Sequence, residues 1–197
     1  MNSDEKNIKG KDVTDAQTDM QAVVKTDMQI EIKDFSHLKE GAIKILQNVL
    51  NKNSKGALII CLSGDLGAGK TTFVQTCASL LGIEERITSP TFVIMKKYKL
   101  NEGEVLGEVA PKLDIKQYKN LIHIDAYRLG GERDLESLRF MDFVKDRANI
   151  IFIEWPERLL GAINSLKAGE LGDLGAIIFN INIDHKNDGV RIFSISR

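Results

Sequence analysis

The sequence predicts an α/β fold in which helices cover both faces of a mainly parallel central sheet. Short apolar blocks suited to buried parallel strands alternate with segments of helical spacing through the middle of the chain. A glycine-rich turn connects one of these blocks to a helix. Two β-type segments, residues 176–183 and 190–195, flank an Asn-Asp-Gly run that favours a hairpin turn. We therefore expect a three-layer sandwich with antiparallel additions and a C-terminal β-hairpin.

Length and composition predict one domain behind a polar leader. Residues 1–27 carry many acidic groups and few large apolar ones, so we expect them to be disordered, and residues 28–197 to form the domain. The net charge of -1 provides no global basic field for nucleic acid. No apolar run approaches the roughly 20 residues of a membrane helix, and the N-terminus lacks a signal-peptide core. These features predict a cytoplasmic protein without a membrane partner.

The first part of the domain predicts two strand–helix pairs. Alternating residues indicate a half-exposed strand at residues 29–35. Ser36 has the character of a helix N-cap, and apolar residues recur at helical spacing from there to about Asn51. An apolar block at residues 57–62 predicts a buried parallel strand, and residues 72–81 predict the following helix.

The second part of the domain begins where Pro90 interrupts any helix, because it holds Ser89 in an extended conformation. The pattern then predicts, in order, a functional or flexible insertion at residues 101–120, a strand at 121–125, a helix at 134–147, a strand at 150–154 and a helix at 157–167.

The glycine-rich turn at residues 64–71, GDLGAGKT, fits the Walker A pattern of a P-loop NTPase. Its glycines let the backbone approach phosphate oxygens at a helix N-terminus. Lys70 is expected to contact the β and γ phosphates, and the Thr71 hydroxyl to coordinate Mg²⁺. The nucleotide-binding residues predicted here are Asp65, Leu66, Gly67, Ala68, Gly69, Lys70, Thr71 and Thr72.

A P-loop site also needs a carboxylate at the end of a nearby strand to complete its magnesium site. Asp125 and Glu154 each end a predicted strand. Either acid could instead cap the element that follows it. The residues alone leave both uses open.

Four motifs occur in one order: GDLGAGKTTF at residues 64–73, SPTF at 89–92, HIDAYRL at 123–129 and IEWPERL at 153–159. Together they resemble the TsaE (YjeE) family of small bacterial ATPases in tRNA threonylcarbamoyladenosine synthesis, over about residues 30–195. The resemblance implies ATP and Mg²⁺ as cofactors and the TsaD and TsaB proteins as partners. It implies weak ATPase activity alone, in support of turnover by the TsaD–TsaB transferase complex, with tRNA contacted indirectly or weakly.

The resemblance also assigns roles. Lys70, Asp125 and Glu154 are the expected catalytic residues, with Thr71 and Glu154 holding the metal and Asp125 acting as a water-orienting or supporting acid. Thr91 belongs to a switch-like loop near the γ phosphate.

Three further motif residues have two readings each. Trp155 either faces the nucleotide or a partner, or packs in the core. Tyr127 and Arg128 either order the switch-like loop or contact a partner, and a solvated Arg128 is nearly as plausible. His123 is read as a strand residue whose ring finds a neighbour.

The chain departs from the family in a longer leader, a longer insertion at residues 101–120, and Arg139 where a glycine is common. A phosphotransferase lid would supply arginines, and the insertion contains none. A GTPase would need an Asn/Thr-Lys-x-Asp signature, which is missing. A nucleotide-binding scaffold without hydrolysis stays open. For the basic patch at Lys96, Lys97, Lys99 and Arg128, a solvated face is favoured over an RNA contact.

Overall fold

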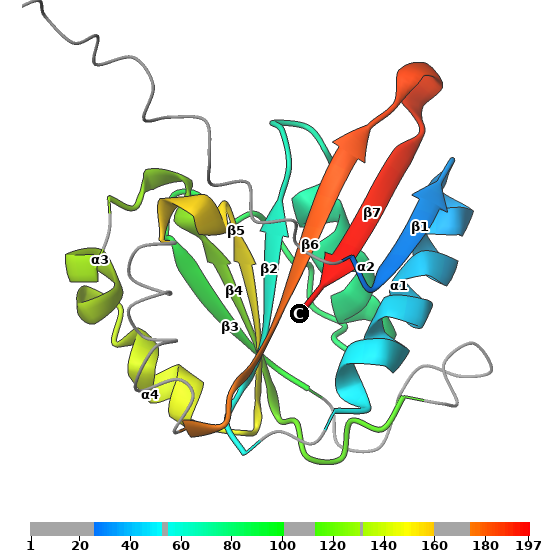
Figure 1. Cartoon of the computed structure of the whole chain (residues 1–197). Helices are drawn as coiled ribbons and strands as arrows, with labels where there is room; N and C mark the ends of the chain where they lie inside the picture. The colour runs from blue at the N-terminus through cyan, green and yellow to red at the C-terminus, as the bar shows by residue number, and fades with distance from the viewer. Residues whose placement is uncertain (1–25, 53–54, 101–112, 131, 160–173) are drawn as a thin grey trace, which may run out of the picture.

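The computed structural model describes residues 26–52, 55–100, 113–130, 132–159 and 174–197. Within these ranges, seven strands form one sheet in the order β1-β7-β6-β2-β5-β4-β3 (Figure 1). The strands are β1 (Met28–Ile32), β2 (Leu58–Ser63), β3 (Met95–Lys99), β4 (Asn120–Asp125), β5 (Asn149–Glu154), β6 (Ile177–His185) and β7 (Arg191–Ser196). Nearly all of the predicted leader lies outside the described residues, and so does most of the predicted insertion.

The centre of the sheet is parallel and its margins are antiparallel. Strands β6, β2, β5 and β4 pair in parallel, whereas β3, β7 and β1 add antiparallel pairs. Every residue of β5 is buried, as expected of a central strand covered on both faces. Strands β6 and β7 form the predicted C-terminal hairpin, joined through the short 3₁₀ helix η4 (Asn187–Gly189). The predicted fold class is confirmed.

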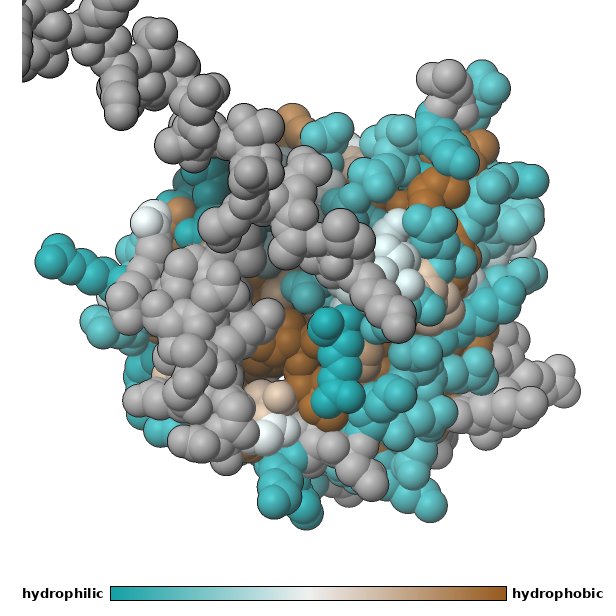
Figure 2. All heavy atoms as spheres, viewed as in Figure 1, coloured by the Kyte–Doolittle hydropathy of each residue, from teal (hydrophilic) through white to brown (hydrophobic). Residues whose placement is uncertain are grey.

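Helices on opposite faces of the sheet complete three layers. Helices α1 (Phe35–Leu50) and α2 (Lys70–Leu80) pack on one face, and α3 (Glu132–Ser137) and α4 (Phe140–Lys145) on the other. Successive strand residues belong to different cores, with Ile60 and Phe152 facing α1 and α2, and Ile59 and Ile151 facing α3 and α4. In the view of Figure 2, hydrophobic side chains lie at the centre of the face and hydrophilic ones cover its right-hand part. No helix among the described residues is long and apolar enough to cross a membrane.

The start of α1 corrects the predicted N-cap. Asp34, not Ser36, caps the helix, and its Oδ1 accepts a hydrogen bond from the backbone N–H of His37 at 3.0 Å. Aspartate and serine are both good N-caps, so the local pattern alone could not decide between residues 34 and 36. One consequence is that Phe35 becomes the first helical residue and is 68% exposed.

The single helix predicted at residues 134–147 is wrong, because Arg139 divides it into α3 and α4. Arg139 has φ 53° and ψ 39°, a left-handed conformation that cannot continue a right-handed helix. Leu135 and Phe140, on either side of the break, are both buried in the same core. The position where the family commonly has glycine is thus one that needs positive φ.

The segment before β4 is part of the core where it is described. Leu113, Ile115 and Tyr118 are buried against the α1 and α2 face, and Asn120 already belongs to β4. Where a helix is predicted at residues 157–167, the structure has the 3₁₀ helix η3 (Pro156–Arg158) with Leu159 as its C-cap. Residues 160–167 lie outside the described residues.

Candidate nucleotide-binding site

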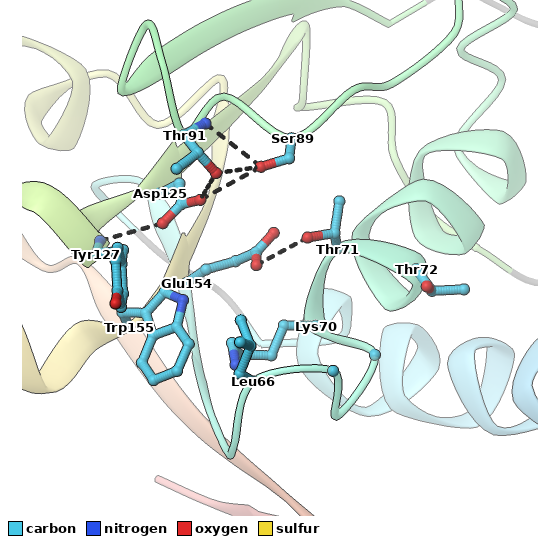
Figure 3. Close-up of a pocket in the computed structure, with 12 residues that line it drawn as sticks. Leu66, Lys70, Thr71, Thr72, Ser89, Thr91, Asp125, Tyr127, Glu154 and Trp155 are labelled. Atoms are coloured by element: carbon cyan, nitrogen blue, oxygen red, sulfur yellow. Dashed lines mark hydrogen bonds between the residues drawn. The ribbon is translucent and has the colours of Figure 1, made fainter.

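The predicted site residues meet at the carboxyl ends of the parallel strands, where ligands bind in open α/β sheets. Strand β2 leads into the P-loop, and the last residues of β4 and β5, Asp125 and Glu154, are paired in register. Glu154 is also in register with Leu62 of β2. A cleft of about 460 Å³ opens between the P-loop and these two strand ends (Figure 3).

The P-loop reaches its conformation through glycines. Gly64, Gly67 and Gly69 have φ of 137°, 79° and 102°. A Cβ on Gly64 would lie 2.5 Å from the carbonyl oxygen of Ile183, so this position also has no room for a side chain. The backbone N–H of Phe73 donates to the Gly69 carbonyl at 2.8 Å and joins the loop to α2. Strand, glycine loop and helix follow one another as predicted.

Lys70 is held inside the site although it carries a charge. It is 5% exposed, and its Nζ donates to the carbonyl oxygens of Gly64 at 2.6 Å and Asp65 at 2.9 Å. The same nitrogen lies 3.7 Å from the ring centroid of Trp155. Burial lowers the pKa of Lys70, and the charge of Glu154 opposes that shift. A desolvated ammonium of this kind gains most from an anionic ligand.

Glu154 joins the P-loop to the neighbouring strands. Its Oε2 accepts a hydrogen bond from the Thr71 hydroxyl at 2.9 Å, and its Oε1 lies 2.7 Å from His123 Nε2. The carboxylate is 3% exposed. A hydroxyl and a carboxylate in direct contact are oxygen donors of the kind that Mg²⁺ takes beside substrate phosphates and water. The described residues contain no cluster of three His, Cys, Asp or Glu able to hold a metal, and such a magnesium site does not require one.

His123 contacts a predicted site residue, whereas the sequence analysis read it only as a strand residue whose ring finds a neighbour. Its ring is fully buried, its Nε2 contacts Glu154, and its Nδ1 has no hydrogen-bond partner in the described part of the chain. A carboxylate only accepts, so the ring donates Nε2–H and fixes the direction of Glu154. Residue spacing could have predicted this contact, because residues 123 and 125 of one strand share a face with Glu154 of the next.

Asp125 caps the element that follows it, as one of its two predicted uses, and also contacts the SPTF loop. Its Oδ1 accepts the backbone N–H of Tyr127 at 3.1 Å and caps the 3₁₀ helix η2 (Ala126–Arg128). Its Oδ2 accepts hydrogen bonds from the hydroxyls of Thr91 and Ser89. The acid therefore binds the SPTF loop, while Glu154 binds Thr71. The division of metal-binding and water-orienting roles between the two acids stays a prediction.

Two residues that adjoin the ends of β4 and β5 adopt strained backbone conformations. Ile94 has φ 66° and Trp155 has φ 59°, and a β-branched residue with positive φ is a genuine outlier. The Ile94 carbonyl accepts the backbone N–H of Asp125 at 2.9 Å, and the Trp155 N–H donates to the Leu62 carbonyl at 3.2 Å. Both conformations are held by the sheet.

Trp155 lies between the core and the cleft. Its half-buried ring packs at the margin of the α3 and α4 core and also lines the cleft. The ring of Tyr127 lies 5.3 Å from it, and the guanidinium of Arg158 lies 5.6 Å from the Tyr127 ring. The indole therefore forms the wall against which the Lys70 ammonium rests.

The cleft includes most of the predicted residues and adds two. Ser89 and Tyr127 line it in addition to the prediction, whereas Asp65 and Ala68 do not. Asp65 acts through its carbonyl on Lys70. The residues of the basic patch do not line the cleft. Lys96 donates to the Thr88 hydroxyl at 3.0 Å, and Arg128 lies over the exposed ring of Phe92 at 4.8 Å.

Comparison with known proteins places this sequence in a family. The family model described as Threonylcarbamoyl adenosine biosynthesis protein TsaE matches residues 36–189. Three similar curated proteins are each named tRNA threonylcarbamoyladenosine biosynthesis protein TsaE. That of Aquifex aeolicus is 34% identical over 53% of this chain and 62% of its own length. That of Streptomyces coelicolor is 38% identical over 50% and 57%, and that of Haemophilus influenzae is 29% identical over 66% and 71%.

The matches to the Aquifex and Streptomyces proteins thus span about three fifths of those relatives. Among solved structures, Bacillus subtilis YdiB is 25% identical, with a TM-score of 0.47 over 86% of this chain and 84% of that one. The family match covers well over half of the sequence. The chain belongs to the TsaE family of threonylcarbamoyladenosine biosynthesis.

Proposed function

We propose that this chain binds and hydrolyses ATP with Mg²⁺, as an accessory protein that supports turnover of a TsaD–TsaB transferase complex in the cytoplasm. The observation that carries the ATP site is the contact of Thr71 with Glu154 beside the buried ammonium of Lys70. These three groups are the phosphate and metal ligands of a P-loop NTPase, and they converge in one cleft.

Each residue has a role in this proposal. Lys70 leaves the Gly64 and Asp65 carbonyls to bind the β and γ phosphates. Thr71 and Glu154 hold Mg²⁺, which supplies neutralisation of the phosphate charge. Asp125, whose Oδ2 holds the hydroxyls of the SPTF loop, orients the attacking water or the Thr91 hydroxyl near the terminal phosphate.

Weak activity of the isolated chain follows from the lining of the cleft. None of the described residues that line it is an arginine, and P-loop enzymes commonly use an arginine, often from a partner, to stabilise transition-state charge. We therefore expect the isolated protein to turn over slowly and a partner to accelerate it.

The surface around the cleft supports a protein partner. Leu66, Phe92, Val93 and Tyr127 are large apolar residues that are 87%, 84%, 58% and 48% exposed. Leu66 and Tyr127 line the cleft itself, and Phe92 and Val93 follow Thr91 in the chain. Gathered apolar and aromatic side chains of this kind are typical of protein interfaces. TsaD–TsaB is the proposed partner, and tRNA contact is indirect or weak.

Phosphate release from ATP, measured with the chain alone, with TsaD–TsaB alone and with both, tests the proposal. We expect release to rise clearly above the sum of the separate rates only in the full mixture, and to require Mg²⁺. Bound ATP without phosphate release in the full mixture would instead support a non-hydrolysing scaffold. ATP-dependent phosphorylation of an added small molecule would support a phosphotransferase.

A further inference from the structure

Residues 81–94 connect α2 to β3 and include the SPTF loop, which carries Ser89 and Thr91 into the phosphate cleft. Both hydroxyls bond Asp125, and Figure 3 shows that they lie on the same side of the cleft as this acid. These contacts hold only the part of the connection that lies in the cleft. The contacts that hold the residues before Ser89 therefore also influence where the Thr91 hydroxyl lies relative to a bound phosphate.

Gln75 provides such a contact from the middle of α2. Its Nε2 donates a hydrogen bond to the carbonyl oxygen of Ile87 at 2.9 Å. A carbonyl oxygen only accepts, so the amide must turn its nitrogen towards the loop. Ile87 is 5% exposed and packs in the core on the α1 and α2 face of the sheet. The hydrogen bond therefore joins the helix to a part of the loop that is already fixed by packing.

The place of Gln75 on α2 connects this contact to the phosphate site. Gln75 lies four residues after Thr71, and residues four apart lie on the same face of a helix. From that one face, Thr71 contacts Glu154 and Gln75 contacts Ile87. The helix that begins at the P-loop thus also fixes the base of the loop that carries Thr91.

A second contact to the same loop is weaker. Lys96 of β3 donates from Nζ to the Thr88 hydroxyl at 3.0 Å, but both side chains are exposed. Water competes for an exposed hydrogen bond, and a lysine side chain loses rotamer freedom when it is held. The hydrogen bond from Gln75 to Ile87 is partly buried, so we expect it to contribute more to the position of the loop.

We propose that Gln75 is a positioning residue for ATP hydrolysis, which holds the SPTF loop so that Ser89 and Thr91 face the terminal phosphate. It acts through the Ile87 carbonyl and does not line the cleft. This inference rests on the proposed function and deepens it, because it assigns a role to a residue outside the four motifs that mark the family.

Gln75→Ala tests this role in two assays. In phosphate release with TsaD–TsaB, kcat should fall about 5-fold, the scale of one net hydrogen bond, while KM for Mg-ATP stays within about twofold. In the isolated chain, hydrogen exchange of the backbone amides of residues 88–93 should become faster by about the same factor. Alanine favours a helix more than glutamine does, so α2 itself should not weaken.

Three further variants separate the hydrogen bond from packing. Gln75→Glu has nearly the same shape but presents only acceptors to the Ile87 carbonyl, so it should lose at least as much kcat as Gln75→Ala. Gln75→Arg keeps N–H donors and should recover most of the activity. Ser79→Ala, an exposed change one turn further along α2, should alter neither assay.

The two assays keep the role of Gln75 separate from the proposed function. Unchanged exchange in residues 88–93 of Gln75→Ala, or full activity in Gln75→Glu, would overturn the positioning role. Faster exchange with an unchanged kcat would also overturn it, because the hydrogen bond would then hold the loop without affecting hydrolysis. A wild-type chain that releases no phosphate in the full mixture would overturn the proposed function, and the exchange of residues 88–93 would still decide whether Gln75 holds the loop.

Discussion

The two walls of the phosphate cleft reach left-handed backbone conformations in different ways. The P-loop wall does so at Gly64, Gly67 and Gly69, where positive φ has little steric cost. On the opposite side, Trp155 lines the cleft and Ile94 accepts the backbone N–H of Asp125, and at each of these two residues the side chain adds about 1–2 kcal/mol of strain. The P-loop wall carries little backbone strain, whereas hydrogen bonds to the sheet hold the strained conformations of the opposite wall.

Because of this difference, we expect mutations in the two walls to have different effects. Strained residues cluster where a structure must hold or change a particular geometry. We therefore expect changes in the P-loop wall to act on nucleotide affinity. Changes in the wall formed by the ends of β4 and β5 should act mainly on hydrolysis.

The largest effect is expected for Lys70→Ala in the P-loop wall. It removes the buried cation that would bind the phosphates, and ATP affinity should fall by about 100-fold or more, beyond detection in a routine titration. Lys97→Ala, which removes an exposed lysine of β3, is the matched control and should bind ATP normally. Unchanged ATP affinity in Lys70→Ala would refute the assignment of the loop.

Glu154→Ala tests the opposite wall. The variant should keep measurable ATP binding but lose Mg²⁺-dependent phosphate release by about 100-fold, as for loss of one strong transition-state contact. Glu157→Ala, an exposed acid just after the site, should retain activity. Full turnover by Glu154→Ala would show that Asp125 or water completes the metal site, and the two carboxylates would then exchange roles.

His123→Leu removes the donor that fixes Glu154 without touching the cleft. Loss of such supporting donors costs about 10- to 100-fold in metal affinity or activity, so the Mg²⁺ concentration for half-maximal phosphate release should rise by about that factor. His123→Gln, which keeps an N–H donor, should recover part of the loss. An unchanged Mg²⁺ dependence in His123→Leu would mean that the ring only fills space.

The smallest effect is expected for Arg139→Gly, which relieves left-handed strain at a residue that does not line the cleft. Strain relief exceeds the loss of the exposed Arg139–Asp142 pair and the added chain entropy by about 0.5 kcal/mol, which should raise Tm by about 1–2 °C. Arg133→Gly, inside α3, should instead lower stability by about 1 kcal/mol. Both variants should bind ATP as the wild type does, and a change in ATP affinity would connect this break to the site.

Most of the fold could be predicted from local pattern, and the errors lay where that pattern was ambiguous. Asp34 and Ser36 are both good caps, so only the hydrogen bond to His37 identified the first residue of α1. Apolar spacing continued across Arg139 because both short helices bury the same face, and a positive φ leaves no periodic signal.

The sequence by itself determined the P-loop, because its glycines, Lys70 and the flanking strand and helix are neighbours along the chain. It also placed Asp125 and Glu154 at strand ends. Only the tertiary structure decided that Glu154 takes Thr71 and His123 as partners, and that Arg191 holds the Ala68 carbonyl from 123 residues away. Side-chain alternation predicts the face of the strand on which a residue lies. The residues beside it on the next strands depend on strand order, which the packing of the whole domain decides.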